Sequence, residues 1–199
     1  MSAALEGLTL GDAPAAWERL GFAVVEGVVA VGGVRLRCAG RDGGAGIRSW
    51  TLRDAASTDV DGLATEATDA PPPAPVEHPN GAIALDHVVV MTPGFEATRD
   101  ALSSAGLDLR RERDDLRGVR MAFFRVGPTI VELVENPKAP TAGFWGLVVV
   151  VSDIDATAAL LGDRLGQVKD AVQPGRRIAT VHDPDGPSTA VAFMSPRGV

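Results

Sequence analysis

The stretch that decides the fold of this chain is Ala84-Leu85-Asp86-His87-Val88-Val89-Val90-Met91-Thr92, followed by Glu96-Ala97-Thr98. It returns as Phe144-Trp145-Gly146-Leu147-Val148-Val149-Val150-Val151, followed by Asp155-Ala156-Thr157. The offset between Glu96 and Asp155 is 155 − 96 = 59 positions, and Gly127-Pro128-Thr129 matches Gly186-Pro187-Ser188 at the same offset. A fixed offset of this kind indicates that one supersecondary unit is used at least twice.

Each copy predicts a strand, a helix and three further strands. In the first copy, residues 85–92 are short and β-branched, which is typical of a strand. A helix is expected at 93–107, with Gly106 as its natural C-terminal stop. The remaining strands of this copy are expected at 107–112, 119–126 and 129–134, with a polar turn at 113–118. The second copy predicts a strand at 147–151, a helix at 154–165 and strands at 167–172, 177–182 and 189–194.

The N-terminal part of the chain resembles a degenerate copy of the same unit. It predicts a strand at 5–10, a helix from Pro14 and a hairpin at 24–31 and 34–38, and residues 47–52 could begin a fourth copy that never completes. The expected organisation is a degenerate βαββ-type unit at 1–53, an acidic, Pro-rich linker at 54–82, and a domain of two βαβββ units at 83–199, the units spanning 83–136 and 144–195. A fixed strap packed over the domain is the alternative for the linker.

Composition excludes several classes of function. The chain has 199 residues, of which 45% are apolar, and a net charge of −7, so it predicts a globular protein that does not bind nucleic acid. Its apolar runs are too short for a bilayer, its start resembles no signal peptide, and Cys38 has no partner for an internal disulfide. We therefore expect a cytoplasmic protein with no membrane partner. Glycine-rich phosphate-binding motifs are absent, so no nucleotide cofactor is expected.

The tandem units resemble the vicinal oxygen chelate superfamily, which includes glyoxalase I, bleomycin-resistance proteins, extradiol dioxygenases and methylmalonyl-CoA epimerase. The resemblance rests on Leu85-Asp86-His87-Val88-Val89-Val90, which opens a unit, and Gly127-Pro128-Thr129-Ile130-Val131-Glu132-Leu133, which closes it. It covers residues 83–195 well and 5–52 loosely. It implies an α+β fold in which tandem βαβββ units form a cup-shaped, half-open barrel with helices outside and the ligand inside. It also implies that the first and last strands of each unit supply metal ligands.

His87 and Glu132 are the candidate catalytic and metal-ligating residues. Strand alternation predicts that His87 shares a face with Leu85 and Val89, opposite Asp86, and that Glu132 lies among apolar neighbours. A carboxylate in such a place is costly to bury unless it is paired, protonated or bound to metal. Imidazole and carboxylate suit one divalent ion such as zinc, nickel, manganese or iron.

The second copy lacks both groups. At the same offset Gly146 matches His87, and Val191 matches Glu132, or Ala192 if the register slips by one. Because most metal sites have at least three protein ligands, a third must come from elsewhere. His182 is the candidate third ligand, and the other candidates are Glu135, Asp183, His78 or a second chain.

Other interpretations of these residues remain open. A buried Glu132 could act as a proton-transfer base without metal, or it could pair with Arg120 or Arg125 across the hairpin. Arg176 and Arg177 are interpreted as a turn with solvated charges or as an anion holder. The candidate substrate-binding residues, each also explicable by core packing or surface ion pairing, are Arg125, Phe123, Phe144 and Trp145.

Two function classes stand out from the sequence. The first is a glyoxalase-like lyase or isomerase that acts on a small carbonyl compound and that a metal could assist. The second is a non-catalytic small-molecule binding protein of the bleomycin-resistance type, which the loss of ligands in the second copy favours. A third is an interaction module that pairs with a second chain. The expected partner is a small molecule, and monomer and homodimer both remain open.

Overall fold

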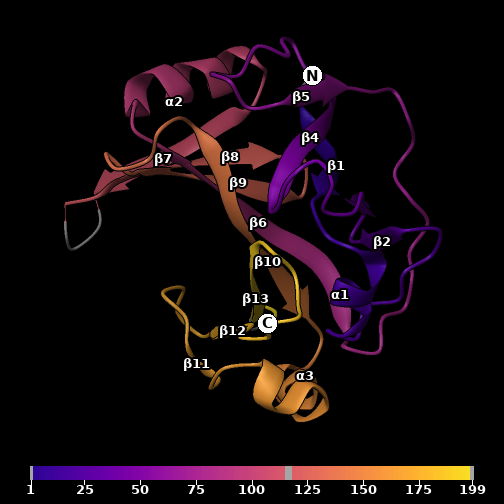
Figure 1. Ribbon diagram of the computed structural model, residues 1–199. Helices are drawn as coiled ribbons and strands as arrows, with labels where there is room; N and C mark the ends of the chain where they lie inside the picture. Colours follow the sequence, from indigo (N-terminus) through magenta and orange to yellow (C-terminus); the bar gives the residue numbers. More distant parts are fainter. Residues whose placement is uncertain (1, 115–117, 198–199) are drawn as a thin grey trace.

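A computed structural model describes residues 2–114 and 118–197 (Figure 1). Two β-sheets dominate the structure. The larger has eight strands in the order β11-β12-β13-β10-β6-β9-β8-β7 and is built by the C-terminal half of the chain. The elements of this half are β6 (Ala82–Thr92), α2 (Phe95–Ser104), β7 (Asp108–Asp114), β8 (Arg120–Val126), β9 (Thr129–Glu135), β10 (Gly143–Val151), α3 (Ile154–Leu161), η1 (Gly162–Arg164), β11 (Lys169–Asp170), β12 (Arg177–Thr180) and β13 (Ala190–Met194).

Two βαβββ units meet at the centre of this sheet, where β6 and β10 pair in antiparallel fashion. In each unit the closing strand lies parallel beside the first, β9 beside β6 and β13 beside β10. At the offset of 59, Gly146 is the counterpart of His87 and Val148 is the counterpart of Val89. The pairing is symmetric in these positions, because His87 pairs with Val148 and Val89 pairs with Gly146. The repeat seen in the sequence is therefore confirmed as a repeat in the structure.

Local sequence signals explain where the helices begin and end. The Asp153 carboxylate caps α3 by accepting hydrogen bonds from the backbone N–H of Asp155 at 2.9 Å and of Ala156 at 3.1 Å. Gly106 follows α2 with a φ of 94°, a conformation that glycine adopts without steric cost. The predicted turn at 113–118 includes residues 115–117, which lie outside the described residues. None of the helices in the described ranges is long and apolar enough to cross a membrane.

The N-terminal sheet is a reduced copy of the larger sheet. Its order, β2-β3-β1-β4-β5, repeats that of β8-β9-β6-β10-β13. The strand directions agree as well, since β3 is parallel to β1, β4 is antiparallel to β1, and β5 is parallel to β4. The fourth unit begins at β4 and closes with β5, with no helix between them. The elements are β1 (Ala4–Leu10), α1 (Pro14–Glu18), β2 (Val28–Val31), β3 (Val34–Cys38), β4 (Ile47–Arg53) and β5 (Thr65–Ala67).

The two sheets share two irregularities in their central strand pair. The pairing of β6 with β10 skips Ile83, Asp86 and Trp145, and the pairing of β1 with β4 skips Glu6 and Arg48 at the places that correspond to Asp86 and Trp145. Each skipped residue is a β-bulge, an extra residue in one strand of the pair. Matching the bulges aligns Glu6 with Asp86, an offset of 86 − 6 = 80. The N-terminal half therefore repeats the geometry of the C-terminal half with different side chains.

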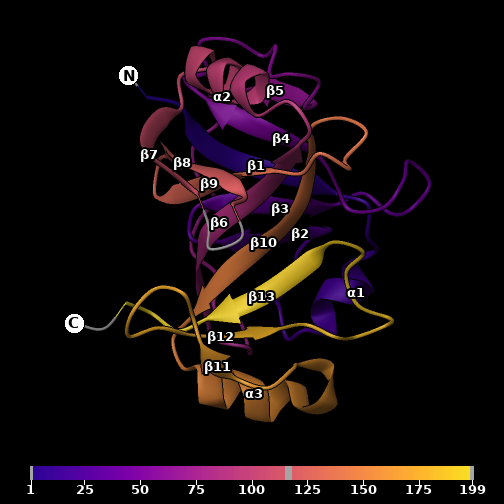
Figure 2. The same cartoon turned by 90° about the vertical axis from the view of Figure 1, so that its left-hand side faces the viewer.

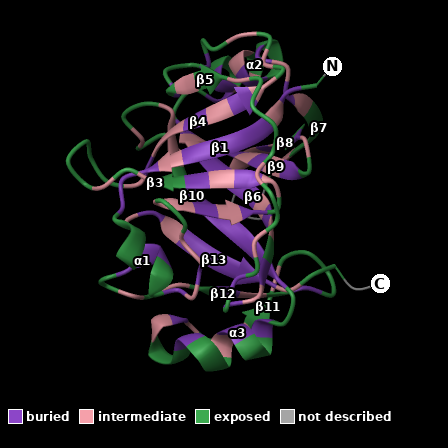
Figure 3. Cartoon of the chain, turned by 90° about the vertical axis from the view of Figure 1, so that its right-hand side faces the viewer, coloured by how far each residue is buried: buried purple, intermediate pink, exposed green. Residues whose placement is uncertain are grey.

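The two sheets pack face to face around one shared core (Figures 1 and 2). Trp50 of β4 contacts Phe144 of β10 with ring centroids 5.3 Å apart, and Phe22 stacks on Phe193 at 5.8 Å. Helices α2 and α3 lie at the two ends of the larger sheet, and the face of this sheet turned away from the core is concave (Figure 1). The fold is therefore the expected α+β cup without a closed barrel. The outer face of the N-terminal sheet, turned away from the core, points the other way (Figure 3).

Residues 54–82 are held against the N-terminal sheet. The segment contains β5, and beyond it the Arg53 Nε donates to the Ala70 carbonyl at 3.2 Å, while the Arg35 Nη2 donates to the Pro71 carbonyl at 2.8 Å. These contacts join the segment, called the strap below, to the N-terminal sheet. The division of the chain at 53 and 82 into domains stays a prediction.

Candidate active site

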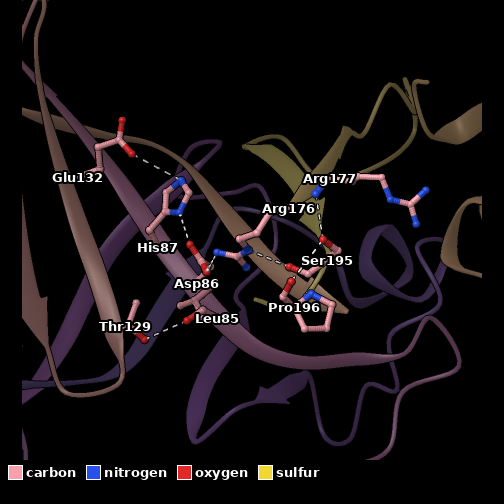
Figure 4. A network of polar contacts seen from close by, with 9 residues as sticks. All are labelled: Leu85, Asp86, His87, Thr129, Glu132, Arg176, Arg177, Ser195 and Pro196. Carbon is pink, nitrogen blue, oxygen red and sulfur yellow. Dashed lines mark hydrogen bonds and ion pairs between the residues drawn. The ribbon is translucent and has the colours of Figure 1, made fainter. Parts of the chain in front are cut away.

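His87 and Glu132 lie side by side on the concave face of the eight-stranded sheet (Figure 4). Strands β6 and β9 are parallel neighbours, and Glu132 pairs with Val89, two residues beyond His87. The distance from His87 Nε2 to Glu132 Oε2 is 3.7 Å, and the two side chains are 10% and 19% exposed. Because 3.7 Å is too long for a hydrogen bond, neither group satisfies the other, and both can engage a third group.

A β-bulge at Asp86 brings its carboxylate to His87. The strand pairing passes from His87–Val148 to Leu85–Val149, so Asp86 is the extra residue. Its Oδ2 lies 2.8 Å from His87 Nδ1. The prediction that Asp86 faces away from His87 is therefore wrong. The prediction that Leu85 shares a face with His87 is also wrong, since Leu85 is buried in the shared core.

Arg176 supports Asp86 from the other unit. It lies in the turn between β11 and β12, its side chain is 3% exposed, and its Nη1 donates to Asp86 Oδ1 at 2.6 Å (Figure 4). Its Nε donates to the Ser195 carbonyl at 2.9 Å. The interpretation of Arg176 as a solvated turn charge is wrong, whereas it fits Arg177, which is exposed and pairs with Asp155. Sequence offers no signal for this contact, because Arg176 and Asp86 stand 90 positions apart.

The two acids beside His87 have opposite electrostatic environments. Burial tends to raise the pKa of Asp86, but hydrogen bonds from His87 and Arg176 outweigh it, and the net pKa lies below the ordinary value. The pKa of Glu132 is raised, mainly because burial disfavours the charged form, while His87 and Arg113 oppose that rise. Asp86 is therefore held as a carboxylate, and Glu132 takes up a proton more readily than an exposed glutamate.

Arg113 and Phe123 extend the site along the concave face. Phe123 pairs with Glu132 across β8 and β9. The Arg113 guanidinium lies over the Phe123 ring, 5.2 Å from its centroid, which is a cation–π geometry. Its Nε is buried and has no hydrogen-bond partner among residues 2–114 and 118–197. Sequence reasoning missed Arg113 because it stands at the start of the predicted polar turn.

The remaining arginines of this hairpin are not paired with Glu132. Arg125 is exposed, pairs in the sheet with Ile130 on the face of His87, and forms no ion pair within residues 2–114 and 118–197. Arg120 forms an ion pair with Glu96 instead. The ion pair between Glu132 and Arg120 or Arg125 that the sequence left open is therefore not formed.

The structure separates the two candidate aromatic residues. Phe144 pairs with Val90, and its ring packs against Trp50 on the core side of β10, away from His87. Trp145 is the bulge residue of β10 and is 53% exposed. The structure therefore does not bring Phe144 to the His87–Glu132 pair.

The second unit contributes an apolar wall to the concave face. Val148 pairs with Ala192 in the same way that Val89 pairs with Glu132, so Ala192 rather than Val191 is the counterpart of Glu132. Val148, Ala192 and Met194 form a small apolar cluster. Beyond this cluster, Thr180 pairs with Ala192 and Lys169 pairs with Ile178, so the second unit places these two polar residues on the same face.

The residues present do not fit a metal site of three protein ligands. Across the described part of the chain, no group of three His, Cys, Asp or Glu side chains is placed to hold a metal ion. His182 lies near Gly166 at the end of β12, Asp183 pairs with Arg19, and His78 is bonded within the N-terminal half. The expectation of His182 as a third ligand is therefore not supported.

Comparison with known proteins gives similarity in structure alone. No protein-family model matches the chain, and no curated protein matches its sequence. A mutant of 4-hydroxymandelate synthase from Streptomyces coelicolor superposes with a TM-score of 0.65 at 14% identity, covering 98% of this chain and 93% of that chain. At this identity the similarity shows the fold.

Two smaller structures match the chain less closely. Methylmalonyl-CoA epimerase from Mycobacterium tuberculosis has a TM-score of 0.49 at 20% identity, covering 59% of this chain and 91% of that chain. A variant of the Streptomyces coelicolor epimerase, in complex with 2-nitronate-propionyl-CoA, has a TM-score of 0.48 at 18% identity, covering 59% of this chain and 97% of that chain.

Proposed function

The chain has the vicinal oxygen chelate fold, and from that premise we propose that its concave face is the active site of an enzyme that moves a proton on a small carbonyl compound. One observation carries this proposal. A buried acid with a raised pKa faces an imidazole that a carboxylate and an arginine hold from behind. Such paired groups with separated electrostatic environments are typical of general acid–base sites.

The geometry assigns a role to each side of the imidazole. A carboxylate can only accept, so the Asp86 contact places a proton on His87 Nδ1 and turns Nε2 toward Glu132. In the reactive state Nε2 also carries a proton and Glu132 is ionised. Asp86 and Arg176 act as positioning residues, because they touch His87 or each other and not the substrate.

The proposed reaction is an enolisation and its reversal. Glu132 takes a proton from the carbon beside the carbonyl, so a C–H bond breaks and a carboxylic acid forms. The electron pair moves onto the carbonyl oxygen, to which His87 Nε2 donates its proton. Return of a proton from Glu132 to the carbon, and of the enol proton to His87, restores the carbonyl compound. If the Glu132 proton has exchanged with water in between, the carbon carries a solvent hydrogen, and no oxidant or reductant is required.

Two regions of the concave face would hold the substrate. The Arg113 guanidinium, whose buried Nε has no partner in the described part of the chain, offers a cation to an acid group next to the reacting carbon. Phe123 lies under that guanidinium and beside Glu132. The apolar wall at Val148 and Met194 suits an alkyl group on the opposite side.

A non-catalytic binding protein is the second candidate function. The apolar wall favours it, because one half of the concave face offers contact surface and no reactive group. A pure binder has no turnover to lose, so the two candidates differ in one measurable property.

Solvent-deuterium exchange tests the proposal. Wild-type protein in D₂O with a panel of small carbonyl compounds should exchange the hydrogen beside the carbonyl, as followed by proton NMR. The Glu132→Gln variant should slow exchange by about 100-fold or more while still binding the compound. Glu135→Gln is the matched control on the same strand and should exchange normally. Wild-type binding without exchange would establish the second candidate, and equal exchange by Glu132→Gln would overturn the assignment of the base.

A further inference from the structure

The outer face of the N-terminal sheet corresponds to the concave face of the larger sheet. Aligning the shared bulges places Gly7 at the position of His87. The neighbouring parallel strand then places Arg37 at the position of Glu132, because Thr9 pairs with Arg37 as Val89 pairs with Glu132. The same scaffold position therefore carries a cation on one sheet and an acid on the other.

A hollow occupies this outer face. It has a volume of about 150 Å³, and its lining includes the acid Glu6 together with Gly7, Thr9, Arg35, Arg37, Thr51 and Thr68. Gly7 leaves open the space that an imidazole fills on the other sheet. A Cβ at Gly7 would lie only 3.2 Å from the Arg35 carbonyl oxygen, so even the smallest side chain would crowd the floor of the hollow.

The strap forms one wall of the hollow and is fixed in place. Thr68 N–H donates to the Leu52 carbonyl at 3.0 Å, and the next residues of the strap receive hydrogen bonds from Arg53 and Arg35 at Ala70 and Pro71. The wall is therefore built before any ligand arrives, which lowers the entropy cost of binding.

The charges in the hollow leave a cation uncompensated. Glu6 is 3% exposed and forms ion pairs with both Arg35 and Arg53, so one buried carboxylate faces two guanidinium groups. Arg37 is exposed and has no ion pair or side-chain hydrogen bond in the part of the chain that the structure describes. In a chain of net charge −7, this is a locally positive hollow surrounded by threonine hydroxyls.

We propose that this hollow is a second binding site, for the carboxylate or phosphate group of a small molecule. Arg37 supplies the charge, and the hydroxyls of Thr9, Thr51 and Thr68 supply further hydrogen bonds. The volume suits one oxyanion group and not a whole cofactor. The site is independent of the proposed enzyme activity, because it lies on the opposite side of the shared core.

Titration of the full-length protein with inorganic phosphate and, separately, with acetate tests the proposal. Backbone amide NMR shifts should saturate for residues of β1, β3 and β4, and the two probes distinguish a tetrahedral dianion from a planar carboxylate. Arg37→Gln should weaken binding by about tenfold, since it removes the charged donor. Thr51→Val should weaken it less and should not change the net charge.

The matched control is Arg41→Gln, which removes an exposed arginine of the same half outside the hollow. It should bind both probes like wild type, and so should His87→Ala, which alters only the larger sheet. Far-UV circular dichroism confirms that each variant is folded. Absence of saturable shifts with both probes, or equal weakening by Arg41→Gln and Arg37→Gln, would overturn the site.

Discussion

The Arg176 guanidinium holds the Asp86 carboxylate at 2.6 Å across the boundary between the two βαβββ units. Asp86 belongs to the first strand of one unit, and Arg176 belongs to a turn of the other. The second unit, which has Gly146 and Ala192 at the positions of His87 and Glu132, therefore fixes the imidazole of the first unit from behind. The candidate site thus depends on both units, although its reactive groups come from one.

Removal of Arg176 should destabilise the fold. The Arg176→Leu variant leaves Asp86 as a buried carboxylate without its cation, which typically costs about 3–5 kcal/mol in the free energy of unfolding. Arg177→Leu breaks only an exposed ion pair and should cost less than about 1 kcal/mol. Urea denaturation followed by tryptophan fluorescence measures both. Similar losses for the two neighbours would contradict the role assigned to Arg176.

The raised pKa of Glu132 should appear as a pH-dependent stability. The folded state binds this proton more tightly than the unfolded chain, so wild-type stability should fall as pH rises from the ordinary glutamate value near 4.5 through the raised value. The stability of Glu132→Gln should not show this decline, so the variant should become more stable relative to the wild type over the same pH range. Turnover should rise with pH through the raised pKa, because the base must be ionised. A stability difference between the two proteins that does not change with pH would contradict this prediction.

A single substitution should turn the concave face into a better metal site. Ala192 lies in the same row as Val148 and His87, on the face of Glu132. Ala192→Glu adds a third ligand to the imidazole and the carboxylate, so zinc should bind at least about tenfold more tightly than to the wild type. Isothermal titration calorimetry gives the affinities, and Ala192→Gln is the neutral control. If the glutamate and glutamine variants bind zinc equally, the three residues do not converge.

Cys38 should be unreactive in the folded protein. Burial raises the pKa of its thiol to about 11, and Asp12 and Glu18 add to the rise. At pH 8 only about one molecule in a thousand would then carry the reactive thiolate. Reaction with a chromogenic disulfide should therefore be much slower in the native state than in urea. Equal rates in both conditions would mean that the thiol is not shielded as described.

Periodicity in the sequence was enough to predict the tandem units, because strand and helix patterns depend on local side chains. The offset of 59 predicted two copies of one unit, and the structure pairs their first strands, β6 and β10, within one sheet. The sequence had left open whether the units pair within one chain or between two. It could not place Asp86, since a bulge inserts one residue without leaving a composition signal and reverses the expected face.

The second repeat was harder to recognise in the sequence. Leu5-Glu6-Gly7-Leu8 matches Leu85-Asp86-His87-Val88 only as an acid that follows a leucine, with an aliphatic residue two positions later, a pattern too short to stand out before the shared bulges are known. Arg113 and Arg176 escaped prediction for a different reason. Arg113 belongs to β7 but falls in the stretch predicted as a polar turn, so its contact with Phe123 on the neighbouring strand was not expected. Arg176 lies in a turn, and tertiary structure alone brings it to Asp86.

The packing of the two sheets against one core limits how a small molecule can move between the two outer faces. The concave face of the larger sheet and the outer face of the N-terminal sheet open in opposite directions (Figures 1 and 3). A compound released from one face must diffuse through bulk water to reach the other, so direct channelling between them is impossible. Any communication between the two faces must pass as mechanical strain through buried side chains such as Trp50 and Phe144.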